Sequence, residues 1–163
     1  MNITYQEIDK KMRNKIIAEY GNREARYTHD FETTIKKHVH IETGCHSIVA
    51  LHEGKPVGFI STCIKTFAAP LSHMQDAYID ILEVDKQYRR QGIAATLVAQ
   101  AEQWAAQQGF AQIRSWSSNN KVEAIPMWHA LGYGLCPAKI WVEWCQKAVD
   151  GFYVVKKLSS SEK

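Results

Sequence analysis

The stretch "VDKQYRRQGIAATLVAQAEQW", residues 84–104, places three basic side chains and a glycine directly before a helical pattern. The basic residues are Lys86, Arg89 and Arg90, and no acid occurs between Lys86 and Gln91 or in the first helical turn. Helix starts usually favour Ser, Asp or Asn at the cap and acids in the first turn, because both compensate the free amides and the positive end of the helix dipole. We therefore expect a bound anion at this loop, with simple solvation of the two arginines as the alternative.

The residues on either side of this loop predict a β-α-β unit. Apolar residues recur with helical period behind Gly92, which predicts a helix over 92–108 that Gly109 ends. "AYIDILEV" (77–84) and "AQIRSWS" (111–117) are typical of strands. Because a helix connects them, these two strands should be parallel neighbours in one sheet.

The rest of the chain is rich in strands and hairpins. We expect further strands at 2–8, 46–52, 56–67, 139–144 and 152–158, and helices at 9–20, 28–40 and 123–132. The last helix should start near Glu123, because Pro126 is tolerated only in a first turn. Asp150–Gly151 is a hairpin-type turn signal. The prediction is an α/β single domain over 1–158 with a mixed, mostly antiparallel sheet, and a frayed tail at 159–163.

Composition narrows the function classes. The 163 residues carry a formal charge of +3, which argues against nucleic acid as a partner. No stretch approaches the roughly 20 apolar residues that span a bilayer, and "MNITYQEIDKKMRNK" does not read as a signal peptide. The four cysteines form no C-x-x-C pair, so we expect buried, reduced thiols and a cytoplasmic protein. The seven histidines offer no i, i+4 pair, so we expect no metal site.

Two motifs resemble a known family. "RRQGIA" (89–94) fits the Q/R-x-x-G-x-G/A signature of the GNAT family of N-acetyltransferases, and Val84 lies eight residues before Gly92, as in that family. "AIPMWHALGY" (124–133) resembles the family's A-I-x-L-Y-x-x-L-G-F run. The resemblance implies the acyl-CoA N-acyltransferase fold, with splayed parallel strands and acetyl-CoA as co-substrate.

The resemblance also implies which residues hold acetyl-CoA. The end of the first parallel strand, at Leu82 and Val84, would pair through its backbone with the pantetheine amides. The family's asparagine position falls on Lys121, and Asn119 and Asn120 next to it are the candidates. The loop amides would hold the pyrophosphate, and they belong to Arg89, Arg90, Gln91, Gly92, Ile93, Ala94 and Ala95.

The catalytic residues are less well determined. The family's usual tyrosine acid falls on Trp128, whose indole cannot donate a proton at neutral pH. Tyr133, Tyr78 or water could replace it. An acceptor amine must lose a proton before it attacks, and strand 77–84 offers Asp80 and Glu83, on opposite faces by simple alternation. Asp80 is favoured, because it matches an acidic position of amine-acetylating relatives and shares the parity of Leu82 and Val84.

The acceptor itself is not identified by the sequence. Aromatic residues that could line its site are Tyr78, Trp116, Trp141 and Trp144, whereas Trp104 is expected in the core. Loops 21–30 and 68–76 are the expected specificity elements. We expect an enzyme that moves acetyl from acetyl-CoA to a primary amine of a small molecule or peptide by direct attack. The alternative is a non-catalytic acyl-CoA-binding module, and a homodimer is left open in either case.

Overall fold

The protein folds around one seven-stranded sheet. The computed structural model describes residues 1–20, 31–142 and 145–158. The strand order is β1-β2-β3-β4-β5-β7-β6, and only the pair β4–β5 is parallel among the described strands. The strands are β1 (Ile3–Glu7), β2 (Cys45–His52), β3 (Lys55–Thr66), β4 (Gln75–Val84), β5 (Gln112–Ser118), β6 (Gly134–Val142) and β7 (Lys147–Lys157).

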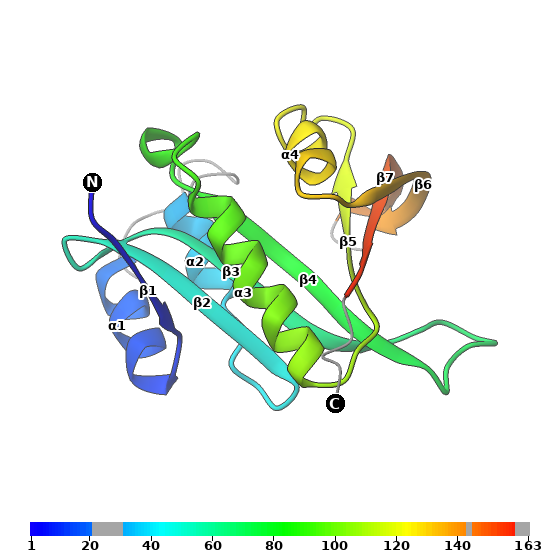
Figure 1. Ribbon diagram of the computed structural model, residues 1–163, viewed down its shortest axis with the longest axis horizontal. Helices are drawn as coiled ribbons and strands as arrows, with labels where there is room; N and C mark the ends of the chain where they lie inside the picture. Colours follow the sequence, from blue (N-terminus) through cyan, green and yellow to red (C-terminus); the bar gives the residue numbers. More distant parts are fainter. Residues whose placement is uncertain (21–30, 143–144, 159–163) are drawn as a thin grey trace.

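The helices cover both faces of the sheet (Figure 1). They are α1 (Lys10–Tyr20), α2 (Phe31–His38), α3 (Ile93–Gln107) and α4 (Ala124–Ala130), with a 3-10 turn, η1, at Lys86–Tyr88. α3 follows β4 and leads into β5, as the β-α-β pattern predicts. The predicted mixed sheet and the order of the predicted elements are confirmed. The described residues do not include loop 21–30, the start of the predicted helix 28–40, Trp144 or the tail at 159–163.

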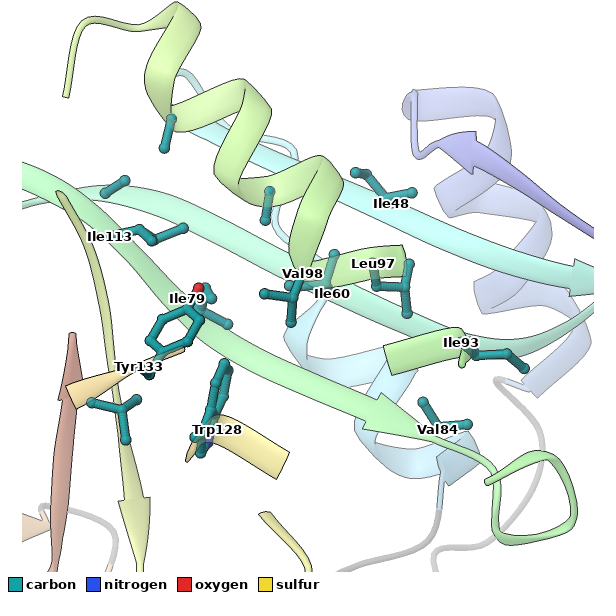
Figure 2. Close-up of a cluster of buried hydrophobic side chains, with 14 of the residues drawn as sticks. Ile48, Ile60, Ile79, Val84, Ile93, Leu97, Val98, Ile113, Trp128 and Tyr133 are labelled. Carbon is teal, nitrogen blue, oxygen red and sulfur yellow. The ribbon is translucent and has the colours of Figure 1, made fainter. Parts of the chain in front are cut away.

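Two apolar clusters hold these layers together. α3 and α4 pack on one face, where Leu97, Val98 and Trp128 meet strand residues such as Ile60 and Ile79 (Figure 2). α1 and α2 pack on the opposite face, where Ile16 and Ile35 meet Val49 and Phe59. The apolar stripe of α3 is buried as its period predicts. Burial at roughly 25 cal/mol per Å² of apolar surface is the main stabilising contribution in such a core.

The two parallel strands separate soon after they meet. β4 and β5 are paired only at Ala77–Ile113 and Tyr78–Arg114. One step further, the Ser115 hydroxyl donates to the Ile79 carbonyl at 2.8 Å, so a side chain takes over from the backbone ladder. Figure 1 shows the strands diverging from there, β4 towards the loop before α3 and β5 towards α4. The predicted splay is confirmed.

The predicted hairpin turn at Asp150–Gly151 is wrong. Both residues lie inside β7, where they pair with Lys139 and Ala138 of β6. Gly151 serves a close approach instead, because a Cβ there would lie 2.4 Å from the Ser117 carbonyl oxygen and 2.6 Å from the Trp116 ring. A glycine inside a strand commonly marks such a contact.

The cysteine prediction is also wrong. Cys45 and Cys63 face each other in the register of β2 and β3 and form a disulfide. Cys136 is an exposed thiol, and Cys145 is half-buried. Opposed strand positions bring two Cβ atoms close enough for a disulfide, and this pairing is invisible until the register is known.

Candidate active site

The loop before α3 presents backbone amides rather than a capped helix end. The Asp85 carboxylate caps η1 by accepting from the Gln87 amide at 3.0 Å. Gly92 then forms the N-cap of α3 with a left-handed φ of 81° and no side-chain cap. The first amides of a helix have no acceptor within the helix, so those of Ile93, Ala94 and Ala95 remain available to an anion.

Gly92 leaves room for a ligand at this helix end. A Cβ built on Gly92 meets no heavy atom of the described residues within 4 Å, so among these residues open space lies where a side chain would stand. The backbone conformation selects glycine independently, because a side chain is strained at that φ. An uncapped helix end with open space beside it fits the pyrophosphate of acetyl-CoA, as the loop signature implies.

Arg89 is compensated by the protein itself. Its guanidinium donates to the Val84 carbonyl at 3.0 Å, to Glu83 at 3.0 Å and to Glu123 at 2.9 Å. This residue therefore ties the end of β4 to the start of α4, and it does not need the bound anion that the sequence suggested. Arg90, with a left-handed φ of 63°, is exposed in the same loop. Gln91 donates from its side chain to the Gln87 carbonyl at 3.3 Å.

The end of β4 offers the second part of a cofactor site. Leu82 and Val84 turn their side chains into the cluster beneath α3, and at these two residues β4 pairs with β3 on one edge and with no described strand on the other. The amides and carbonyls on the other edge have no ladder partner among the described strands. Unpaired strand groups can pair with an extended ligand, such as the pantetheine arm that the resemblance places here.

Asp80 sits at a β-bulge, which changes the direction of its side chain. The register runs from Ser61–Ile81 to Thr62–Ile79, so Asp80 has no opposite residue in β3. Ile79 consequently packs in the cluster beneath α3, whereas Ile81 packs against the cluster beneath α1 and α2. The alternation argument that gave Asp80 the parity of Leu82 and Val84 is therefore wrong, because a bulge inserts one residue.

The Asp80 carboxylate has two cationic or polar partners. Its Oδ1 accepts from Lys65 Nζ at 2.5 Å, and its Oδ2 lies 3.1 Å from His40 Nε2. Burial alone would raise the pKa of Asp80, but the hydrogen bonds and charges of Lys65 and His40 outweigh it and hold the pKa below its ordinary value. Asp80 is therefore a carboxylate at neutral pH.

His40 is held in place by buried hydroxyls. Its backbone amide donates to Ser61 Oγ at 3.0 Å, and its carbonyl accepts from Ser47 Oγ at 2.7 Å. Ser47 and Ser61 are almost fully buried in β2 and β3, and their hydroxyls contact each other. The segment after α2 is thus fixed over the bulge. Sequence reasoning missed the roles of His40 and Lys65, because only the register of three strands brings them to Asp80.

Among the described residues, one group of side chains has the spacing of metal ligands. Ligating atoms of His38, His40 and Asp80 all lie within 4.8 Å of one another. Burial lowers the pKa of His38, opposed by the charge of Asp80 and reinforced by His40 and Lys37. The Oδ1 of Asp80 is paired with Lys65, and its Oδ2 lies 3.1 Å from His40.

Trp128 and Tyr133 are core residues. Trp128 is 4% exposed and Tyr133 is 3% exposed, and their rings lie 4.8 Å apart in the cluster beneath α3 (Figure 2). The Tyr133 hydroxyl donates to Glu102 at 3.0 Å. Burial, together with the charge and hydrogen bond of Glu102, raises the pKa of Tyr133. A phenol with a raised pKa is a weaker acid, so this tyrosine is a poor replacement for the family's proton donor.

The other aromatic candidates are divided between the site and the rest of the surface. Tyr78 lies beside Asp80, with Lys65 Nζ 4.1 Å from its ring centroid. Burial and then the charge of Asp80 raise the pKa of Tyr78 to about 12, against the opposing charge of Arg114. Trp116 is half-buried, and its indole nitrogen has no hydrogen-bond partner among the described residues. Trp141 is 57% exposed on β6, and Trp104 stacks on His46.

Asn119 and Asn120 form the turn that follows β5. The Asn119 amide donates to the Asp150 carbonyl of β7 at 3.1 Å, and the Asn120 side chain accepts from the Ser118 hydroxyl at 2.5 Å. Asn119 also lines an open depression of about 340 Å³ with residues of β6 and β7. In the described structure these two residues therefore contact β5 and β7.

Several solved structures share this architecture. The structure superimposes on the ribosomal-protein-S18-alanine N-acetyltransferase from Escherichia coli with a TM-score of 0.68 and 15% identity, covering 99% of this chain and 97% of that one. Arabidopsis thaliana NAA60 in complex with acetyl-CoA gives a TM-score of 0.69 and 14% identity, covering 96% and 99%. At these identities the likeness concerns the fold.

A further similar structure has a higher identity over a shorter length. A protein from Bacillus anthracis, described as a streptothricin acetyltransferase and solved with acetyl coenzyme A, is 24% identical with a TM-score of 0.58. The match covers 73% of this chain and 66% of that one. No curated protein matches the sequence. Residues 10–133 match the model of the acetyltransferase (GNAT) family. Because this match spans well over half of the sequence, the chain belongs to the GNAT acetyltransferase family, whose co-substrate is acetyl-CoA.

Proposed function

We propose that the protein transfers the acetyl group of acetyl-CoA to a primary amine of a small molecule or peptide by direct attack. The observation that carries this proposal is the Asp80 carboxylate, which lies at the bulge of β4, next to the stretch of β4 that has no ladder partner on its β5 side among the described strands. A primary ammonium has an ordinary pKa of about 10.4, so at neutral pH it needs both a counter-charge and a proton acceptor. A carboxylate held ionised by its neighbours supplies the first of these.

The cofactor side of the proposal rests on backbone groups. Bound acetyl-CoA would supply an activated acetyl thioester, with its pyrophosphate at the amides of Gly92–Ala95 and its pantetheine along Leu82–Val84. Gly92 contributes the left-handed turn and the open space beside it. Arg89 braces the same segment through Glu83 and Glu123.

The proton of the acceptor would leave through the Asp80 site. We assign Asp80 the role of anchoring the ammonium and of accepting its proton, directly or through water, while His40 Nε2 lies 3.1 Å from the same carboxylate. Glu83 is less suited to this role, because its carboxylate is paired with Arg89. No acid is needed for the leaving group in principle, because a thiol of ordinary pKa near 8.5 is a fair leaving group.

A second candidate function is a non-catalytic acyl-CoA-binding module. The observation that favours it is the state of Trp128 and Tyr133, which are both buried beneath α3, with the Tyr133 hydroxyl donating to Glu102. Neither is therefore poised to protonate a thiolate. In this alternative, the protein binds acetyl-CoA at the same site but does not transfer the acetyl group.

Release of free CoA distinguishes the two functions. The purified protein is incubated with acetyl-CoA and a panel of polyamines, aminoglycosides, amino acids and peptides, and free thiol is measured over time. Amine-dependent thiol release that is lost in Asp80→Asn supports the transferase. Tight acetyl-CoA binding with no thiol release for any amine would instead support the binding module.

A further inference from the structure

The Asp80 carboxylate, which we assign to the acceptor amine, is already paired with a lysine of the protein itself, Lys65. Lys65 Nζ lies 2.5 Å from Asp80 Oδ1 and 4.1 Å from the centroid of the Tyr78 ring. A carboxylate oxygen and an aromatic face are the two groups by which proteins recognise an ammonium ion. The side chain of Lys65 is a primary alkylamine, so its head group is chemically the same as that of the proposed acceptor.

This ion pair differs from the neighbouring one in its access to solvent. Arg114 and Asp76 are joined at 2.5 Å with side chains 19% and 4% exposed, and Arg114 also lies over the Phe67 ring. Lys65 and Asp80 are 42% and 24% exposed. A buried pair is costly to separate, whereas a lysine that is more than a third exposed contributes little through its pair. Lys65 can therefore leave Asp80, while Arg114 stays.

We propose that Asp80 and the ring of Tyr78 form a binding site for a primary ammonium group, and that Lys65 occupies this site in the free protein as an intramolecular competitor of the acceptor. The proposal rests on the proposed function in one respect, namely that the acceptor is a primary amine. It adds the residues that recognise the amine and an occupant that must move before the amine binds.

The competition has a measurable consequence. A tethered group on a short flexible stem competes at an effective concentration in the millimolar range. If Lys65 fills the site about nine-tenths of the time, the apparent affinity for an external amine is about tenfold weaker than the intrinsic one. Such a site selects acceptors that gain additional contacts elsewhere on the protein.

The direct test measures amine binding without acetyl-CoA. The probe is n-butylamine, and its dissociation constant is determined by NMR titration for the wild type, Lys65→Met and Lys65→Arg. We expect Lys65→Met to bind n-butylamine about tenfold more tightly, and Lys65→Arg to bind like the wild type because it keeps a cation at Asp80. Lys55→Met removes an exposed lysine at the other end of β3 and should change nothing.

Two further results would support or overturn the proposal. The double variant Lys65→Met/Asp80→Asn should lose the tighter binding, since the carboxylate is gone. Equal affinity of the wild type and Lys65→Met for n-butylamine, with both proteins folded by circular dichroism, would overturn the proposal. So would tighter binding that persists after Asp80→Asn.

Turnover separates this proposal from the proposed function. With an amine that the protein acetylates, Lys65→Met should lower KM for the amine about tenfold and leave KM for acetyl-CoA unchanged. If Lys65→Met binds n-butylamine tightly but no amine is ever acetylated, the ammonium site stands and the transferase function fails. If an amine is acetylated with the same KM by the wild type and Lys65→Met, the function stands and the competitor role of Lys65 is wrong.

Discussion

Three structural features single out Asp80 as a candidate functional residue. It is the extra residue of a bulge, it has a lowered pKa, and it contacts His40 as well as Lys65. Bulges commonly re-aim a side chain next to a functional site. These features make Asp80 the residue whose charge matters most to the proposed chemistry.

We predict that Asp80→Asn lowers turnover about 10²–10⁴-fold, the usual contribution of a positioned acid–base group. Affinity for acetyl-CoA should stay within about twofold, because the cofactor groups belong to other residues. The loss should shrink as pH rises, since more of the amine arrives already deprotonated. Steady-state kinetics across pH and calorimetry with acetyl-CoA check these outcomes.

Glu83→Gln is the matched control on the same strand. It removes a carboxylate that pairs with Arg89 rather than with Lys65, so its effect on turnover should be smaller than that of Asp80→Asn. Full activity of Asp80→Asn at neutral pH, together with loss of activity in Glu83→Gln, would show that Glu83 handles the amine.

Gly92 tests the cofactor loop at the same scale. We predict that Gly92→Val weakens acetyl-CoA binding at least about tenfold, or roughly 1.4 kcal/mol. The side chain would enter the open space beside the helix end and would be strained at a φ of 81°. Calorimetric titration with acetyl-CoA gives the affinity.

Gly54→Val separates strain from ligand contact. Gly54 has a similar φ of 76°, and a Cβ there also meets no atom within 4 Å, but it lies in the β2–β3 hairpin. Both substitutions should therefore lower the melting temperature, and only Gly92→Val should weaken binding. Equal acetyl-CoA affinity in Gly92→Val and the wild type would remove this loop from the site.

At the scale of elements, α4 is anchored to the core through its buried Trp128. We predict that Trp128→Phe lowers the free energy of unfolding by roughly 1–2 kcal/mol, as expected when a buried side chain is shortened, and changes kcat by less than about threefold. Trp141→Phe, on the exposed face of β6, is the control for stability. A loss of 100-fold or more in kcat with folding intact would reveal a direct role for the Trp128 indole.

The elements that the sequence predicts well are those whose signals are local. α3 follows from its apolar period, its N-terminal Gly92 and the closing Gly109, and α4 follows from Pro126 in its first turn. The predicted turn at Gly151 was wrong, because in the sequence a glycine that makes room for the Trp116 ring cannot be told from a glycine of a turn. A local sequence pattern shows that the backbone requires a glycine at a position, but it does not show whether the reason is a turn or a close tertiary contact.

The candidate site also has one part with a local sequence signal and one part without. The loop from Arg89 to Ala95 carries a local signature, so it was identifiable from the sequence. The bulge at Asp80 depends on the register with β3, and the contacts of His40 and Lys65 depend on β2, β3 and β4 lying together. Positions 40, 65 and 80 are far apart in the chain and carry no shared spacing that could have predicted their contact.

At the scale of the whole molecule, the sheet consists of two halves with a narrow connection. β1 to β4 form one half, and β5, β7 and β6 form the other. Among the described residues, β4 and β5 connect the two halves through two ladder pairs, the Ser115–Ile79 hydrogen bond and the side-chain bonds of Arg114 and Gln112 to Asp76. In the described ranges, no helix is long and apolar enough to cross a membrane. Because only two ladder pairs join β4 to β5, a ligand along the free edge of β4 would add hydrogen bonds where the sheet has fewest.

We predict that acetyl-CoA stabilises this junction and protects specific amides from hydrogen exchange. At a concentration about 100 times its dissociation constant, a ligand that binds only the folded state adds about 2.7 kcal/mol of stability. The added protection should fall on residues 82–84 and 91–95, since these carry the strand edge that lacks a ladder partner in β5 and the helix end that lacks a side-chain cap. Mass spectrometry of peptides after deuterium labelling, with and without acetyl-CoA, measures it segment by segment.

The centre of β2 provides the internal reference for this experiment. Residues 48–51 are buried and paired on both sides by β1 and β3, so their exchange should be slow in both states and change only through global stabilisation. A rise in protection that is equal in 48–51 and 82–84 would mean that acetyl-CoA stabilises the fold without pairing to β4. Protection confined to 82–84 and 91–95 would place the cofactor across the opening between the two halves of the sheet, next to Asp80.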